Sequence, residues 1–165
     1  MCDVQKAYEN WMSDKDVTEF LMWDAHASVE ETEKVIGRWV FAYDYGRMNW
    51  CITLRRSGEP IGCISAAQDY PEYGYCEIDY SIGKDHWGKG YMTEALKAVT
   101  EYIFRNTDYD WIQAKCDTEN YGSKRCLEKC SYKQVGNPTL PSEKRGGEIR
   151  KYHMMRIDRR DIPGL

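Results

Sequence analysis

The segment from residue 75 to residue 105 changes its hydrophobic period partway, and this change constrains the fold more than any other feature of the sequence. Residues 75–82, YCEIDYSI, alternate strictly between apolar and polar side chains, which is typical of a β-strand. From Gly90 to about Arg105 the apolar residues recur at helical spacing instead. The stretch DHWGKG joins the two patterns and carries two glycines one residue apart. The sequence therefore predicts a strand, a tight glycine turn and an amphipathic helix in direct succession.

The remaining elements predict one layered domain over residues 1–165. A helical pattern broken near residues 13–15 opens the chain, and a second helix follows a capping-box pattern formed by Ser28 and Glu31. Further strands are expected at residues 49–55, 61–68, 110–116, 131–136 and 148–157, with a short helix at 120–130 and a loop at 137–147. This order is typical of an α/β or α+β fold in which helices cover a sheet and the first three strands form antiparallel hairpins.

The composition narrows the classes of partner. The sequence has 23 Lys and Arg residues against 27 Asp and Glu residues, which gives a net charge of −4. This charge argues against nucleic acid as a partner, because nucleic-acid binding depends on dense patches of Lys and Arg. An acidic surface can attract a cationic small molecule, although it also serves solubility alone. No apolar run is long enough to span a bilayer, and the N-terminal residues lack the apolar stretch of a secretory signal. We therefore expect a cytoplasmic protein with no membrane partner, whose seven cysteines are mostly reduced thiols.

The glycine turn predicts a site for an anion. The first backbone N–H groups of a helix lack intrahelical partners and carry the positive end of the helix dipole. Gly88 and Gly90 would let a ligand approach these groups closely, and Lys89 could add positive charge. A dinucleotide fingerprint would require a third glycine where Thr93 stands, and the chain contains no P-loop. Two interpretations remain, namely the pyrophosphate of coenzyme A and a tight turn that binds nothing.

Two motifs at the family's spacing resemble the GNAT acetyltransferase superfamily. The stretch YCEIDYSIGKDHWGKGYMTEALKAVTEYIF looks like its central motif, particularly in the subgroup of ribosomal-protein N-terminal acetyltransferases of the RimJ/RimL type. The stretch DTENYGSKRCLEKCSYKQVG, residues 117–136, is similar to the second motif. The resemblance follows the order of elements from Val17 to Arg156 and is dense from Tyr75 to Gly136. It implies a mixed, mostly antiparallel central sheet that is splayed in its middle and flanked by helices.

The resemblance also implies that acetyl-CoA is the acetyl donor. The amides from about Gly88 to Thr93 would hold its pyrophosphate, and the pantetheine arm would run between the strands of Ile78 and Trp111. Asn120 would hydrogen-bond that arm, although its residue type equally suits a helix N-cap. The implied coenzyme-binding residues are Ile82, Trp87, Gly88, Lys89, Gly90, Tyr91, Met92, Thr93, Asn120 and Ser123.

Acetyl transfer to an amine requires a neutral nitrogen, and amines with pKa values of about 8 to 10 are mostly protonated at neutral pH. A general base near the amine is therefore expected. Glu77 stands at the position of the family's catalytic glutamate, and Asp79 follows on the same strand face. Two neighbouring carboxylates could raise each other's pKa or bind the positive charge of the substrate. Alternating polar residues are also typical of the solvent face of an antiparallel strand.

The oxyanion and the departing CoA thiolate need donors of their own. The family uses a backbone amide on the strand at residues 80–82 for the oxyanion. Many relatives protonate the thiolate with a tyrosine seven residues after the asparagine, but Leu127 takes that position here. Ser123 is the substitute that we expect, with first-turn helix capping as its alternative role.

The acceptor is predicted only as a primary amine, on either a protein N-terminus or a small molecule. A non-catalytic module that binds coenzyme A is the alternative, because the tyrosine is absent. The family's first strand normally precedes its first helix, whereas this sequence starts with the helix; an open sheet edge invites pairing, so a homodimer is expected. Cys126 and Cys130 share a helix face but are too few to bind a metal, and none is expected.

Overall fold

The computed structural model describes residues 4–162 and 164, apart from the side chains of residues 67–69 and 143. Its strands are β1 Asn49–Thr53, β2 Pro60–Tyr70, β3 Tyr75–Ile82, β4 Trp111–Asp117, β5 Lys133–Gly136, β6 Thr139–Ser142 and β7 Glu148–Asp158. They form a seven-stranded sheet in the order β1-β2-β3-β4-β7-β5, with β6 paired to β7. The β3–β4 pair is parallel, whereas β1–β2 and the three pairs of β7 are antiparallel. The predicted mixed, mostly antiparallel sheet flanked by helices is therefore confirmed.

The chain divides into two compact units. The first comprises residues 1–67 and 80–89, and the second comprises residues 68–79 and 90–165. Because β2 and β3 each contribute residues to both units, the division passes along these two strands. One domain over residues 1–165 stays a prediction.

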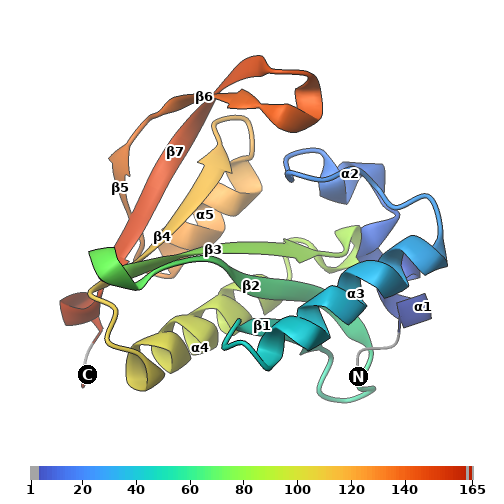
Figure 1. Cartoon of the computed structure of the whole chain (residues 1–165), viewed down its shortest axis with the longest axis horizontal. Helices are drawn as coiled ribbons and strands as arrows, with labels where there is room; N and C mark the ends of the chain where they lie inside the picture. The colour runs from blue at the N-terminus through green and yellow to red at the C-terminus, as the bar shows by residue number, and fades with distance from the viewer. Residues whose placement is uncertain (1–3, 163, 165) are drawn as a thin grey trace. The chain divides into compact units, whose positions relative to one another are not determined.

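Helices form the N-terminal part of the first unit (Figure 1). They are α1 Val4–Ala7, the π-helical turn η1 Tyr8–Met12, α2 Lys15–Thr18 and α3 Val29–Tyr43. The predicted break near residues 13–15 is confirmed, because the Ser13 N–H closes the π-turn on the Tyr8 carbonyl at 3.1 Å and Asp14 then caps α2. The apolar side chains of these helices share one core cluster, formed by Ala7, Trp11, Met12, Val17 and Ile36.

Helix α3 begins with the capping arrangement that the sequence predicts. The Ser28 hydroxyl oxygen accepts a bond from the Glu31 N–H at 3.4 Å, and the Glu31 carboxylate accepts one from the Ala27 N–H at 2.8 Å. The two bonds satisfy backbone donors at the helix start, where intrahelical acceptors are missing. The carboxylate reaches the residue before the N-cap rather than the N-cap itself, so the reciprocal bond is displaced by one residue.

The strands of the first unit approach each other closely at Gly62. Strand β2 pairs with β1 in an antiparallel hairpin, and a Cβ built on Gly62 would lie 2.4 Å from the Ser81 carbonyl oxygen and 2.9 Å from the Ile82 Cα. Next to it, the Cys63 thiol lies 3.3 Å from the Ser81 hydroxyl. The end of β3, which leads into the glycine turn, therefore packs directly against the β2 backbone at Gly62. A side chain at that position would not fit.

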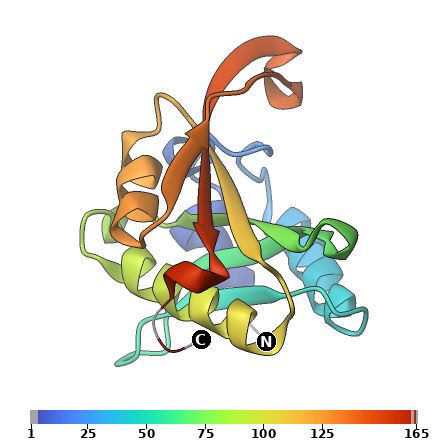
Figure 2. The same cartoon turned by 90° about the vertical axis from the view of Figure 1, so that its left-hand side faces the viewer.

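The second unit is built on one apolar sheet face. The buried side chains of that face are Cys76, Ile78, Ile112, Ala114, Cys116, Met155 and Ile157. Helices α4 Tyr91–Asn106 and α5 Tyr121–Lys129 supply further buried residues, including Leu96, Ile103 and Leu127. The hydroxyls of Thr100 and Tyr132 bond to each other at 2.9 Å within this buried region. Figure 2 shows β4 and β7 side by side, with the β6–β7 hairpin extending beyond them.

The parallel ladder between β3 and β4 is short. It joins three residues of each strand, Tyr75 to Trp111, Cys76 to Ile112 and Glu77 to Gln113. Strand β3 then continues to Ile82 and β4 to Asp117, whereas β4 stays paired with β7 along its whole length. From Ile78 onward the backbone of β3 leaves the ladder with β4, which matches the predicted splay.

Two features bear on the predicted edges. The sequence predicts a loop at residues 137–147, and this is wrong in part, because β6 pairs there with β7. Pro141 obscures the strand in the sequence, although an edge strand tolerates a residue that lacks an N–H. Strand β1 ends the strand order on its side. Dimerisation through this edge stays a prediction.

Candidate functional site

The glycine turn and the start of α4 form a sharply bent stretch of backbone. Gly88 and Gly90 take left-handed φ angles of 72° and 87°, where a residue with a Cβ would be strained. Gly90 is the N-cap of α4, and the Glu94 N–H donates to its carbonyl at 3.0 Å. Amides of a first helical turn have no acceptor within the helix and carry the positive end of its dipole. This backbone geometry suits a negatively charged ligand.

The loop before the turn is fixed within the first unit. The Trp87 indole N–H donates to the Ile82 carbonyl at 2.8 Å. A Cβ built on Gly83 would lie 2.4 Å from the Asn10 carbonyl oxygen, so the loop begins in direct contact with the π-helical turn η1. The Asn10 side chain in turn donates to the Pro60 carbonyl at 2.7 Å. The loop that leads into the glycine turn is thus held by neighbours at its start.

The predicted coenzyme-binding side chains around the turn differ in exposure. Trp87 and Lys89 are exposed, whereas Ile82, Tyr91 and Thr93 are half-buried. Met92 is only 8% exposed and belongs to the core. Met92 can therefore offer a ligand its backbone amide but not its side chain.

Asn120 and Ser123 come together at the start of α5. The Asn120 side-chain oxygen accepts a bond from the Ser123 N–H at 3.0 Å, so Asn120 is the N-cap of the helix. The Ser123 hydroxyl hydrogen-bonds the Cys116 thiol, whose pKa is raised to about 11 chiefly by burial. Leu127, at the position where many relatives have tyrosine, is fully buried. Ser123 therefore links the start of α5 to Cys116, near the end of β4.

Cys126 of α5 and Cys130, the C-cap of that helix, contact the first turn of α4. The Thr93 hydroxyl lies 3.6 Å from the Cys126 sulfur, and the Cys130 thiol donates to the Thr93 carbonyl at 3.5 Å. Bonds from Cys130 and Thr93 lower the pKa of the Cys126 thiol. Among the residues that the structure describes, no group of three or more His, Cys, Asp or Glu side chains could hold a metal ion, and no helix is long and apolar enough to cross a membrane.

Glu77 is held by two neighbours on β4. Its carboxylate forms an ion pair with the Lys115 ammonium at 3.0 Å and accepts a bond from the Gln113 side chain at 3.1 Å. The Glu77 side chain is only 14% exposed, so the ion pair is partly shielded from water. Glu77 is therefore a fixed carboxylate whose charge is paired with Lys115.

Asp79 has the opposite environment, although it lies only two residues further along the same strand face. No hydrogen-bond or ion-pair partner holds its carboxylate among the described residues. The group is open to solvent, yet the protein atoms around it and the negative charge of Glu77 raise its pKa to about 6. Asp79 is thus a carboxylate with a raised pKa and no cationic partner among the described residues.

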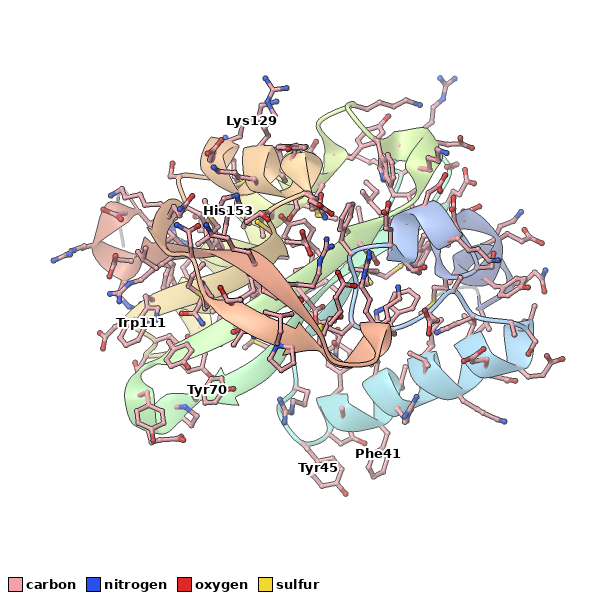
Figure 3. The ribbon with its side chains drawn as sticks, turned by 90° about the horizontal axis from the view of Figure 1, so that it is seen from above. Phe41, Tyr45, Tyr70, Trp111, Lys129 and His153 are labelled. Atoms are coloured by element: carbon pink, nitrogen blue, oxygen red, sulfur yellow. The ribbon has the colours of Figure 1, made fainter. Side chains whose placement is uncertain are left out.

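Stacked aromatic rings border these carboxylates on the same face of the second unit. Tyr75 stacks on Trp111 with ring centroids 5.1 Å apart and on Tyr70 at 4.7 Å, and the Arg156 guanidinium lies 4.2 Å from the centre of the Trp111 ring. Figure 3 shows Tyr70 and Trp111 at the same end of the sheet. The stack gives this end of the face a rigid wall.

An arginine that the sequence did not single out fixes the turn before α5. Arg150 of β7 bonds the Asp117 carboxylate at 2.9 Å and the Glu119 carboxylate at 2.6 Å. Asp117 in turn accepts a bond from the Glu119 N–H at 2.9 Å, directly before Asn120.

Sequence reasoning also missed Gln113 and Lys115. Their alternation placed them on one strand face, but only the register between β3 and β4 brings them to Glu77.

Comparison with known proteins identifies related chains. A family model described as an acetyltransferase (GNAT) domain matches residues 2–133. A relative from Bacillus licheniformis, described as the uncharacterized N-acetyltransferase p20, is 27% identical over 155 residues, which make up 93% of this chain and 86% of the relative.

Several solved structures share the fold. An acetyltransferase of the GNAT family from Bacillus anthracis has a TM-score of 0.82 at 24% identity, over 96% of this chain and 90% of that one. The ribosomal α-N-protein acetyltransferase RimL in complex with coenzyme A has a TM-score of 0.82 at 19% identity, over 94% and 88% of the two chains. Spermidine N-acetyltransferase from Vibrio cholerae, in complex with CoA and spermine, has a TM-score of 0.74 at 14% identity, over 96% and 90%.

Proposed function

Because the chain belongs to the GNAT acetyltransferase family, we propose that it transfers the acetyl group of acetyl-CoA to a primary amine by direct attack in a ternary complex. The observation that carries this mechanism is the contrast between two carboxylates on one face of β3. Glu77 is paired with Lys115, whereas Asp79 is unpaired among the described residues and has a pKa of about 6. One carboxylate is thus unpaired with a raised pKa, while its neighbour is paired with a cation.

Asp79 accepts the proton of the attacking amine in this proposal. A carboxylate with a pKa near 6 is ionised at pH 7, yet it is a stronger base than an ordinary aspartate and so removes a proton more readily. Glu77 stands at the position of the family's glutamate, but its proposed role is electrostatic. Its negative charge raises the pKa of Asp79.

The coenzyme is held by backbone groups in this proposal. The amides from Gly88 to Thr93 bind the pyrophosphate, because they combine left-handed glycines with a helix start. The pantetheine arm bonds the β3 backbone beyond Glu77, where the ladder with β4 has ended, and the Asn120 side chain. Ile82, Trp87, Lys89, Tyr91 and Met92 line the same path. The RimL and spermidine N-acetyltransferase structures are complexes with CoA, which supports acetyl-CoA as the donor.

Ser123 donates a hydrogen bond that stabilises the departing CoA thiolate in this proposal. Its hydroxyl lies at the start of α5, where the bond to the Cys116 thiol keeps it turned toward the end of β4. An amide of residues 80–82 stabilises the oxyanion. The proposal also includes a cytoplasmic location and a homodimer paired along β1. The six described cysteines are free thiols, as is usual in a reducing compartment.

Thiol release from acetyl-CoA with a panel of amines tests the proposal. We expect Asp79→Asn to lower kcat/KM by about 10²- to 10⁴-fold, the usual contribution of a general base, while calorimetric CoA affinity stays unchanged. Lys133→Gln, which removes an exposed ion pair with Asp161, is the matched control and should retain activity. Full activity of Asp79→Asn would mean that a group other than Asp79 is the general base.

A non-catalytic module that binds coenzyme A is the second candidate, favoured by the buried Leu127 where relatives carry a tyrosine. The same assay separates the two functions. CoA binding without thiol release in the presence of any amine would support the module and reject the enzyme.

A further inference from the structure

The ion pair between Glu77 and Lys115 leaves one face of the second unit with a single uncompensated carboxylate. Residues that share this face alternate along β3, β4 and β7, and strand register aligns them: Glu77 opposite Gln113, Gln113 opposite Arg156, and Lys115 opposite Met154. Among the described residues of these three strands the face carries five carboxylates, those of Glu77, Asp79, Asp117, Glu148 and Asp158.

Four of these carboxylates have a cationic partner. Lys115 pairs with Glu77 at 3.0 Å, and Arg150 pairs with Asp117 at 2.9 Å and with Glu148 at 3.5 Å. Arg156 pairs with Asp158 in the same way. Asp79 alone has no cation beside it among the described residues of this unit.

We propose that Lys115 restricts the acceptor to amines that present one ammonium group to this face, and that it excludes polyamines. The proposal rests on the proposed acetyltransferase function and names the substrate class of that same site. Asp79 receives the single ammonium and then its proton, and Lys115 occupies the carboxylate that a second ammonium would need.

The physical reason is a balance of charge over a short distance. A polyamine carries a second ammonium a few carbon atoms from the first, and near Glu77 it would meet the Lys115 ammonium instead of a free carboxylate. Like charges at such separations repel, and the shielding that leaves Glu77 only 14% exposed weakens the screening by water. Lys115 thus discriminates through repulsion as well as by occupying the favourable partner.

Replacement of Lys115 by glutamine tests the proposal, because it frees Glu77 and keeps a polar side chain. The probes are spermidine and a short peptide with a free N-terminus and no lysine. We expect the wild-type protein to favour the peptide, and Lys115→Gln to shift the ratio of kcat/KM values toward spermidine by about three- to tenfold, as one added ion pair would. Lys115→Arg should keep the wild-type ratio, and Lys133→Gln, which removes an ion pair of the same length on β5, should leave it unchanged.

A binding measurement separates this proposal from the proposed function. Spermidine is titrated calorimetrically into the wild-type protein and into Lys115→Gln, both saturated with CoA, so that no turnover is needed. Tighter spermidine binding by Lys115→Gln alone supports the proposal even if no amine is acetylated. Equal affinities, or a wild-type protein that already prefers spermidine to the peptide, would overturn it, whereas absent thiol release with every amine would reject only the acetyltransferase function.

Discussion

At the scale of single residues, the raised pKa of Asp79 makes a specific prediction about pH. A general base works only when it is ionised, so kcat/KM should fall tenfold per pH unit below about pH 6, beyond the fall caused by protonation of the amine itself. An aspartate with its ordinary pKa of 3.8 would move this limb about two pH units lower. The pH profile of thiol release measures the limb.

Two variants identify the group behind that limb. Asp79→Asn should remove the limb together with most of the rate. Glu77→Gln should keep the limb but shift it to lower pH, because the negative charge of Glu77 helps to raise the pKa of Asp79. A limb that stays at pH 6 in both variants would contradict the assignment.

Residue types on the candidate face were predictable, but their partners were not. The strict alternation of residues 75–82 was enough to put Glu77 and Asp79 on one side of a strand. The difference between them depends on Lys115 and Gln113, which come from a strand more than 30 residues later in the chain. Nothing in one sequence states the register of a parallel pair, so the sequence could not show that Glu77 is paired with Lys115 while Asp79 is not.

At the scale of elements, we expect substitution by alanine to lower the free energy of unfolding by different amounts at Gly62 and at Gly88. Gly62→Ala would put a Cβ 2.4 Å from the Ser81 carbonyl oxygen, and the backbone must move to relieve the clash. We expect a loss of about 3 kcal/mol in the free energy of unfolding. Gly88→Ala meets open space but keeps a left-handed φ of 72°, so it should cost about 1 kcal/mol.

Urea denaturation of the two variants measures this difference, with the wild-type protein as the reference. If the Gly88 backbone amide also binds the pyrophosphate of the coenzyme, Gly88→Ala should clearly weaken CoA binding although it has only a small effect on stability. Similar stability losses in the two variants would contradict the close approach of β2 to the end of β3.

Element order was predictable because each long element carries its own period or cap. The strand at residues 75–82 and the cap at Ser28 needed only local pattern and local bonds. Strand β6 was missed because its pairing with β7 depends on a tertiary contact that outweighs the turn-forming composition of residues 137–147. Tertiary pairing overrides local preference most easily in such short edge strands.

At the scale of the whole molecule, strands β2 and β3 each contribute residues to both compact units. The folding of one unit should therefore depend on the folding of the other. If residues 1–165 form one domain, thermal unfolding should follow a single cooperative transition by circular dichroism and by tryptophan fluorescence. CoA at a hundredfold excess over its dissociation constant should stabilise that transition by about 2.7 kcal/mol, because it binds only the folded state. Two separate transitions, with CoA raising only one, would instead mean that the units fold independently and that the ligand binds one of them.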